Sequence, residues 1–366
     1  MITRFHNGKI FTGEKFIDNG EVYVDDRSII QKENADTEID LEGGHLVPAF
    51  IDIQLYGGGG KLFGEHPSVE SLDSTYQYSL QGGAAHILPT VATNANEIVF
   101  AAIEAVRSYW EKGKPGVIGL HLEGPFINKK KKGAHIEQFI RKPTLDDVKE
   151  IMKAGKGIVK IMTLAPEMCD DEIIDYLKHE GVTISAGHTD ATYDEALKGF
   201  AKIPIATHLY NAMSGLQHRA PGMVGAIFNS NAMASVVADG YHVDFAAISI
   251  AKKIMKERLF YITDAVTENK EGYYQHRLDG DRYVVADGTL SGSSLTVLKA
   301  VINGYKHAGI PLEESLRMGS LYPARAIGVD DKLGKIKEGY EAHMTWLSKN
   351  FEIKGVYTNG LLFRAF

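Results

Sequence analysis

The sequence of 366 residues contains one cysteine, Cys169, and lacks any long apolar run. A single cysteine cannot close a disulfide within the chain, which is typical of a reducing compartment, so we expect a cytoplasmic protein. The apolar runs are shorter than the roughly 18 residues that span a membrane, and residues 1–7 lack the apolar core of a signal peptide. These absences exclude a disulfide-stabilised scaffold and a protein built on membrane-spanning helices.

The chain also lacks an excess of positive charge. Its 40 lysine and arginine residues against 47 aspartate and glutamate residues give a formal net charge of -7, which argues against a general nucleic-acid binder. A basic run at residues 129–132 is short, and we interpret it as a solvated loop. With 44% apolar and 24% charged residues, the composition is that of an ordinary globular protein. The length suits a barrel and a smaller appended unit.

Between residues 47 and 263, short apolar strands alternate with helical stretches. This alternation favours parallel pairing, and eight strands is the number in a TIM barrel, although alternation alone is also compatible with an open sheet. We predict an α/β fold, a TIM-like (β/α)8 barrel over residues 47–330. Its strands are expected at residues 49–54, 84–91, 116–122, 159–165, 182–186, 205–207, 234–238 and 259–263, and its helices at 69–82, 95–112, 146–154, 170–180, 193–201, 245–256, 294–306 and 312–318.

Both ends of the chain instead show short strands separated by turns. Strands are predicted at residues 10–12, 21–24 and 28–30, and again at 343–347, 353–357 and 361–364. We expect residues 1–46 and 331–366 to form one small β-sandwich domain beside the barrel. Residues 272–290 depart from the barrel rhythm, and we interpret them as a hairpin inserted after the last barrel strand.

Four predicted barrel strands end in a side chain that can bind a metal ion or a proton. Glu123, His188, His208 and Asp264 each follow the apolar part of a different strand. TIM-barrel active sites are built at the C-terminal ends of the strands, and two histidines with one carboxylate describe a catalytic zinc site that is open to water. Asp264 is then the acid–base partner of that water. Taken alone, Asp264 is also compatible with a helix N-cap.

Several short motifs, taken in their order along the chain, carry a resemblance that covers nearly all of it. The motifs are Val47-Pro48-Ala49-Phe50-Ile51-Asp52 with Gly57-Gly58-Gly59-Gly60, His121-Leu122-Glu123-Gly124-Pro125-Phe126, Lys132-Gly133-Ala134-His135, Gly187-His188-Thr189, Thr207-His208-Leu209-Tyr210-Asn211-Ala212-Met213, Ala220-Pro221-Gly222, Asp239-Gly240-Tyr241-His242, Thr263-Asp264-Ala265, Leu290-Ser291-Gly292-Ser293 and Tyr322-Pro323-Ala324. In this order they resemble the N-acetylglucosamine-6-phosphate deacetylases of the amidohydrolase superfamily. The resemblance implies removal of acetate from a phosphorylated N-acetyl amino sugar, in amino-sugar catabolism.

The resemblance also implies a role for each matching residue. Glu123, His188 and His208 would hold one divalent metal ion, with Zn2+ expected over other divalent ions, while Asp264 would be the catalytic acid–base and His135 would polarise the acetyl carbonyl. The sugar phosphate would be bound by Ala134, Asn211, Ala212, His242, Leu290, Ser291 and Gly292, and by Arg219 from the other subunit of a homodimer. Arg, His and backbone N–H donors are what a phosphate dianion favours. Without the resemblance, His135, His242 and Arg219 would be interpreted as surface or capping residues.

Some positions depart from the pattern of the superfamily. Gln54 and Tyr56 stand where many amidohydrolases carry a His-x-His pair, so we expect no tightly bound second ion. His343 occupies a tail position that is commonly Asp. His218 and Arg219 are adjacent candidates for the phosphate contact, and we prefer Arg219 because its guanidinium is always charged.

Two alternatives to N-acetylglucosamine 6-phosphate deacetylation stay open at this point. One is the same chemistry on the epimer N-acetylgalactosamine 6-phosphate, because one hydroxyl orientation depends on loop detail. The other is a catalytically silent sugar-phosphate-binding relative. The presence of Glu123, His188, His208 and Asp264 argues against the silent relative, because a binder has no need of three metal ligands and an acid–base group together.

Overall fold

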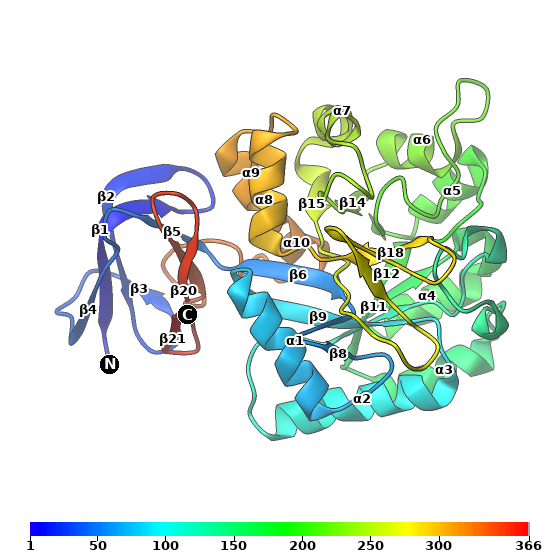
Figure 1. Ribbon diagram of the computed structural model, residues 1–366, viewed down its shortest axis with the longest axis horizontal. Coiled ribbons are helices and arrows are strands. Elements are labelled where there is room, and N and C mark those ends of the chain that lie inside the picture. The colour runs from blue at the N-terminus through cyan, green and yellow to red at the C-terminus, as the bar shows by residue number, and fades with distance from the viewer. Residues whose placement is uncertain (365–366) are drawn as a thin grey trace.

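The computed structural model describes residues 1–364 as a barrel with a smaller β-sheet unit beside it (Figure 1). Residues 365 and 366, the end of the predicted β-domain, lie outside the described residues. The two units are sheets of eight strands each, and each has its own apolar core. No helix within residues 1–364 is long and apolar enough to cross a membrane.

The barrel sheet follows the chain in sequence order, each strand parallel to its neighbour. Its strands are β6 (Phe50–Leu55), β9 (Ala84–Ala92), β10 (Leu120–Glu123), β11 (Val159–Leu164), β12 (Thr183–Ala186), β13 (Ile205–Ala206), β14 (Met233–Val236) and β15 (Leu259–Tyr261). The first and last strands are joined by a parallel bridge between Leu55 and Ala265, where Asp264 N donates to Gln54 O at 2.9 Å. This join excludes the open sheet and confirms the TIM-like barrel.

Helices follow the barrel strands along the chain and cover them (Figure 1). They are α1 (Val69–Gln81), α2 (Asn96–Glu111), α3 (Leu145–Gly155), α4 (Asp171–His179), α5 (Tyr193–Phe200), α6 (Gly222–Asn229), α7 (Phe245–Met255), α8 (Val297–Lys306), α9 (Leu312–Gly319) and α10 (Leu321–Ala326). Capping boxes at Ser68, Thr144 and Thr192 satisfy the first N–H groups of α1, α3 and α5. The sequence does not predict α6 or α10, because α6 is apolar almost all round and α10 is short and contains Pro323.

The two chain ends meet in one sheet, as predicted. The order is β21-β20-β19-β5-β1-β2-β3, with β4 also paired to β1; the strands are β1 (Thr3–Phe11), β2 (Phe16–Val24), β3 (Ile29–Ile30), β4 (Thr37–Asp40), β5 (His45–Pro48), β19 (Met344–Leu347), β20 (Ile353–Thr358) and β21 (Leu361–Arg364). Phe5, Val24, Leu46, Met344 and Trp346 are buried together and hold the two ends in one core. The exact domain boundaries, at residues 46 and 330, stay predictions.

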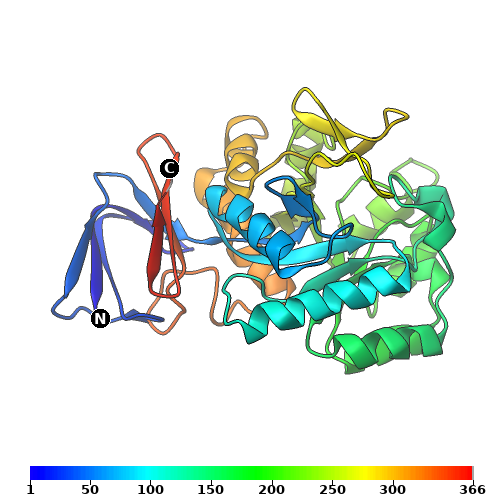
Figure 2. The same cartoon turned by 60° about the horizontal axis from the view of Figure 1, so that its bottom comes forward.

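The insertion after the last barrel strand forms a three-stranded antiparallel sheet, and Figure 2 shows it projecting from one end of the barrel. Its strands are β16 (Arg277–Asp279), β17 (Arg282–Val284) and β18 (Leu290–Ser293), one strand more than the predicted hairpin. Ser293 N donates to Asp264 O at 2.9 Å, and Val266 N donates to Ser293 O at 3.0 Å. The insertion is therefore tied to the end of the barrel at which Asp264 lies. A short ribbon of β7 (Gly57–Gly58) and β8 (Lys61–Leu62) follows β6.

Candidate active site

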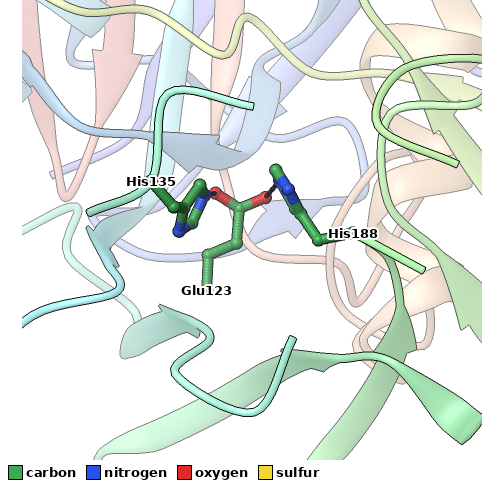
Figure 3. A group of neighbouring side chains, drawn as sticks. All are labelled: Glu123, His135 and His188. Carbon is green, nitrogen blue, oxygen red and sulfur yellow. Dashed lines mark hydrogen bonds and ion pairs between the residues drawn. The ribbon is translucent and has the colours of Figure 1, made fainter. Parts of the chain in front are cut away.

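The predicted ligand and acid–base residues gather at the C-terminal ends of the barrel strands. Glu123 is the last residue of β10, and its side chain is 1% exposed. His188 and His208 lie two residues beyond β12 and β13, and Asp264 lies three residues beyond β15; all three are buried. His135 comes from the loop after β10, and in Figure 3 the Glu123 carboxylate lies between His135 and His188.

Three of these side chains have metal-coordinating atoms that lie close together. Glu123 Oε1 lies 3.1 Å from His208 Nε2 and 3.3 Å from His188 Nε2, and the two ring nitrogens are 3.0 Å apart. His188 Nδ1 lies 2.8 Å from Lys131 O and donates to it, so His188 Nε2 is the ring atom with a free lone pair. Acceptor atoms this close are stabilised by a cation between them. Two imidazoles and one carboxylate are the donor set of catalytic zinc sites, so these residues fit a divalent ion.

His135 is a hydrogen-bond donor beside this group. Its Nδ1 accepts the backbone N–H of Thr93 at 3.2 Å, and because a backbone N–H can only donate, the ring carries its hydrogen on Nε2. That Nε2 lies 3.1 Å from Glu123 Oε2. Donor atoms of Glu123, His135 and His188 all lie within 4.8 Å of one another. Because its Nε2 carries a hydrogen, His135 is a hydrogen-bond donor and not a metal ligand. The Nε2 atoms of His188 and His208 instead face one oxygen of Glu123, Oε1.

The backbone is strained at three of the site residues that follow barrel strands. His188, His208 and Asp264 have positive φ angles of 46°, 35° and 55°. For residues other than glycine this left-handed conformation costs of order 1–3 kcal/mol each, and it gathers at functional sites. In this chain it turns three side chains from different strands into one cavity.

Burial and the neighbouring histidines shift the pKa values of the two carboxyl groups in opposite directions. Desolvation by burial raises the pKa of Asp264, which brings this carboxyl toward the range in which an acid–base group works at neutral pH. Burial also acts to raise the pKa of Glu123, but its contacts with His188, His135 and His208 hold it well below the usual value. No helix follows Asp264 within residues 265–276, so an N-cap role is excluded.

Gln54 and Tyr56 present hydrogen-bond donors to the carboxylates. Gln54 Nε2 lies 3.0 Å from Glu123 Oε1 and 2.9 Å from Asp264 Oδ1, and the Tyr56 hydroxyl donates to Glu123 Oε2. Burial, and then the charge of Glu123, raises the pKa of Tyr56 well above its usual value, so the phenol keeps its proton. Both side chains come from one face of β6 and its extension, two residues apart.

A cavity opens above these residues, and the predicted sugar-binding residues are divided between its lining and its surroundings. His242 lies beside Asp264, with Nε2 3.9 Å from Asp264 Oδ2 and Nδ1 2.6 Å from Asp239 Oδ2. Arg219 is exposed on the loop before α6, outside the lining. The predicted residues found in the lining, besides Glu123, His135, His188, His208 and Asp264, are Ala134, Asn211, Ala212, Leu290, Ser291 and Gly292.

The insertion also brings Tyr274 and His276 into the cavity wall, and neither residue is predicted there from the sequence. Tyr274 OH donates to Thr93 O at 2.5 Å, and Thr93 holds His135. His276 Nδ1 lies 2.9 Å from Ser291 Oγ. Their i, i+2 spacing is compatible with one face of the predicted hairpin, but nothing in the local sequence shows that this face meets the cavity.

A belt of hydrogen-bonded side chains lies beneath the site, inside the barrel. His121 Nδ1 donates to Ile53 O at 2.9 Å and its Nε2 lies 2.8 Å from Thr163 Oγ1, which meets Thr207 Oγ1 at 2.8 Å. Burial lowers the pKa of His121 to about 4, so this ring is neutral at neutral pH. His121 is therefore a structural residue, although its motif also contains Glu123.

Comparisons of the sequence and of the structure find relatives of this chain. The sequence model of the Amidohydrolase family matches residues 45–362. A curated N-acetylglucosamine-6-phosphate deacetylase of Haemophilus influenzae is 33% identical over 93% of this chain and 92% of its own length. An N-acetylgalactosamine-6-phosphate deacetylase of a Shewanella species is 34% identical over 89% and 85% of the two chains. The crystal structure of N-acetylglucosamine-6-phosphate deacetylase from Pasteurella multocida superposes with a TM-score of 0.95, at 34% identity, over all of both chains.

Proposed function

The chain belongs to the amidohydrolase family, and we propose that it removes the acetyl group of N-acetylglucosamine 6-phosphate. The reaction adds water across the amide bond and gives glucosamine 6-phosphate and acetate. The observation that carries the proposal is the convergence of Glu123, His188 and His208 with Asp264 in one cavity, in a chain similar over nearly its whole length to deacetylases of this substrate. The chain is a metal-dependent amide hydrolase.

We infer that Glu123, His188 and His208 would hold one divalent ion through Oε1 and the two Nε2 atoms, with Zn2+ expected over other divalent ions. Bound there, it supplies positive charge that acidifies a water molecule and polarises the acetyl carbonyl. A second ion beside Glu123 would face the N–H of Gln54 and the O–H of Tyr56, which are donors with no lone pair directed at it. This arrangement supports a count of one ion per chain.

The proton transfers then fall to this chain's own side chains. Asp264, held by Gln54, accepts the proton of the attacking water and delivers it to the leaving nitrogen, so that the amine departs neutral. His135 keeps a hydrogen on Nε2 because Thr93 N–H occupies its Nδ1, and it donates to the acetyl oxygen as negative charge develops there. His242, fixed by Asp239, stands beside Asp264 on the sugar side.

The phosphate requires positive charge that the cavity lining does not provide. Within residues 1–364, the lining contains no lysine or arginine, whereas a sugar phosphate carries close to two negative charges. Arg219 is exposed on the loop that follows Asn211 and Ala212, and it has no ion pair among the described residues. We propose that Arg219 of a second copy completes the site in a homodimer.

The second candidate substrate is N-acetylgalactosamine 6-phosphate, supported by the Shewanella relative at 34% identity. The deciding experiment measures acetate release from both epimers by one preparation whose metal content is known. A kcat/KM at least tenfold higher on the glucosamine epimer supports the proposal. The reverse preference assigns the other epimer, and no release from either indicates a silent binding protein. A cytoplasmic location stays a prediction, supported by the single cysteine.

A further inference from the structure

His276 lies in the cavity wall, where one of its ring nitrogens is hydrogen-bonded and the other has no partner among the described residues. The residue precedes β16 in the insertion and is 5% exposed. Its Nδ1 lies 2.9 Å from Ser291 Oγ, and both residues line the cavity. Among residues 1–364, Nε2 has no hydrogen-bond partner, and it is not one of the fully buried unpaired side-chain atoms, so it is accessible to a ligand in the cavity.

The ring is neutral, which limits the kind of ligand it can recognise. Burial lowers the pKa of His276 to about 4, and the ring stacks on Tyr274 with an interplanar angle of 22°. A neutral imidazole has one donor and one acceptor nitrogen, and it carries no charge for a phosphate. A hydroxyl group can pair with Nε2 in either neutral tautomer of the ring, because a hydroxyl both donates and accepts a hydrogen bond.

The wall around His276 is held in place from several sides. His276 and Asn269 exchange two backbone hydrogen bonds of 2.9 and 3.0 Å. Tyr274 N donates to Glu65 Oε1 at 2.7 Å, and Tyr274 OH donates to Thr93 O. Anchored on both sides, the ring presents Nε2 at a fixed position, as recognition of one particular group requires.

We propose that His276 is a specificity-determining residue that hydrogen-bonds one ring hydroxyl of the bound amino sugar, with Ser291 orienting its imidazole. This inference rests on the proposed function and deepens it. The acetamide belongs at the metal end of the cavity and the phosphate with cationic groups, which leaves the hydroxyls as the neutral polar groups of the substrate. A site built to pair with a hydroxyl discriminates against an analogue that lacks it, because its own polar atom is then left unpaired.

The test combines variants with substrate analogues. His276→Leu, His276→Gln and wild type are assayed for acetate release on N-acetylglucosamine 6-phosphate and on its 3-deoxy and 4-deoxy analogues. Wild type should lose about 10–100-fold in kcat/KM on one analogue, the range that corresponds to one unpaired buried group. His276→Leu should lose a similar factor on the complete sugar and nothing further on that analogue. His276→Gln, which keeps a polar atom near Nε2, should recover part of the loss.

His86→Leu provides the matched control, because His86 is a similarly buried histidine that does not line the cavity. It should leave the ratio of kcat/KM between the complete and deoxy sugars unchanged. Bound metal and the urea midpoint of each His276 variant should match wild type. An equal loss by His276→Leu on the complete sugar and on both analogues overturns the assignment of His276 alone. No acetate release by metal-loaded wild type overturns the proposed function and this assignment with it.

Discussion

The Gln54 amide donates its Nε2–H to Glu123 Oε1 across 3.0 Å, and the same nitrogen lies 2.9 Å from Asp264 Oδ1. One neutral side chain thus joins the proposed ligand carboxylate to the proposed acid–base. A His-x-His pair at this position and two residues later could hold a second cation instead. The hydrogen bond keeps the two buried carboxylates in place without that second charge, and it explains why a glutamine suits a site with one ion.

Asp264→Asn should keep the metal and the fold and should lower kcat by a factor on the order of 10² or more, because it removes one acid–base group. The amide can still accept a hydrogen bond from Gln54 through its oxygen. Acetate release is measured together with bound metal. Turnover within a few-fold of wild type at equal metal content would rule out the role of Asp264.

Arg219→Ala should raise KM for the phosphorylated sugar with little change in kcat. The lost charged hydrogen bond corresponds to about 1.5–3 kcal/mol, or roughly 10–150-fold. N-Acetylglucosamine without phosphate should be turned over equally by both proteins. His218→Ala is the matched control, because it alters the neighbouring exposed position, and it should behave as wild type.

Sharing of the site between subunits has a separate test. Arg219→Ala mixed with Asp264→Asn should regain activity as subunits exchange, because some heterodimers contain one site with both residues intact. The mixture is assayed before and after exchange at a substrate concentration well below the KM of Arg219→Ala, and exchange is followed by native mass spectrometry. Exchange without any gain of activity would place Arg219 outside the partner's site.

Tyr56→Phe should weaken metal binding by about 10-fold or more, the usual scale for a group that orients a ligand, because Glu123 Oε2 loses its hydroxyl partner. The measurement is competition with a chelator. Tyr76→Phe is the control, because the Tyr76 hydroxyl is buried without a hydrogen-bond partner among the described residues. Equal metal affinity of Tyr56→Phe and wild type would contradict the assigned contact.

His86→Leu should raise the free energy of unfolding, and more so in acid. Both ring nitrogens of His86 are unpartnered among residues 1–364, and burial, followed by the charge of His343, lowers its pKa well below the usual value. Such a group is neutral when folded and protonated when unfolded, so wild type loses stability as pH falls below about 6.5, by roughly 2 kcal/mol from this residue at pH 5.

Urea unfolding of His86→Leu and wild type at pH 7.5 and pH 5.0 checks this prediction. The stability difference between the two proteins should be larger at pH 5.0 by about 2 kcal/mol. An equal difference at both pH values would show that His86 does not titrate between them in unfolding.

The sequence predicts the barrel and the four strand-end residues because both depend on local patterns. Glu123, His188, His208 and Asp264 each follow an apolar strand, and the parallel topology brings such ends together. Tyr274 and His276 were missed because their place depends on how the insertion folds back over the barrel. That path is fixed by long-range bonds such as Tyr274 OH to Thr93 O, which no local pattern shows.

Hydrogen-bond direction is likewise set by tertiary contacts. From the sequence, Gln54 is a weak ligand or a hydrogen-bond partner of the water or the acetamide, whereas in the structure its NH2 group faces two carboxylates. His135 and His188 are both histidines near Glu123, and what separates a donor from a ligand is the partner of each Nδ1, Thr93 N–H in one case and Lys131 O in the other.

The most direct test of the account is a metal titration followed by acetate release. Metal-free enzyme is supplied with Zn2+ in steps, and the rate of acetate release from N-acetylglucosamine 6-phosphate is measured at each step. The account predicts no activity without metal and a linear rise that ends at about one equivalent per chain, the count of a single open catalytic site. Acetate release that continues to rise in step with a second equivalent, or that needs no metal, would contradict it.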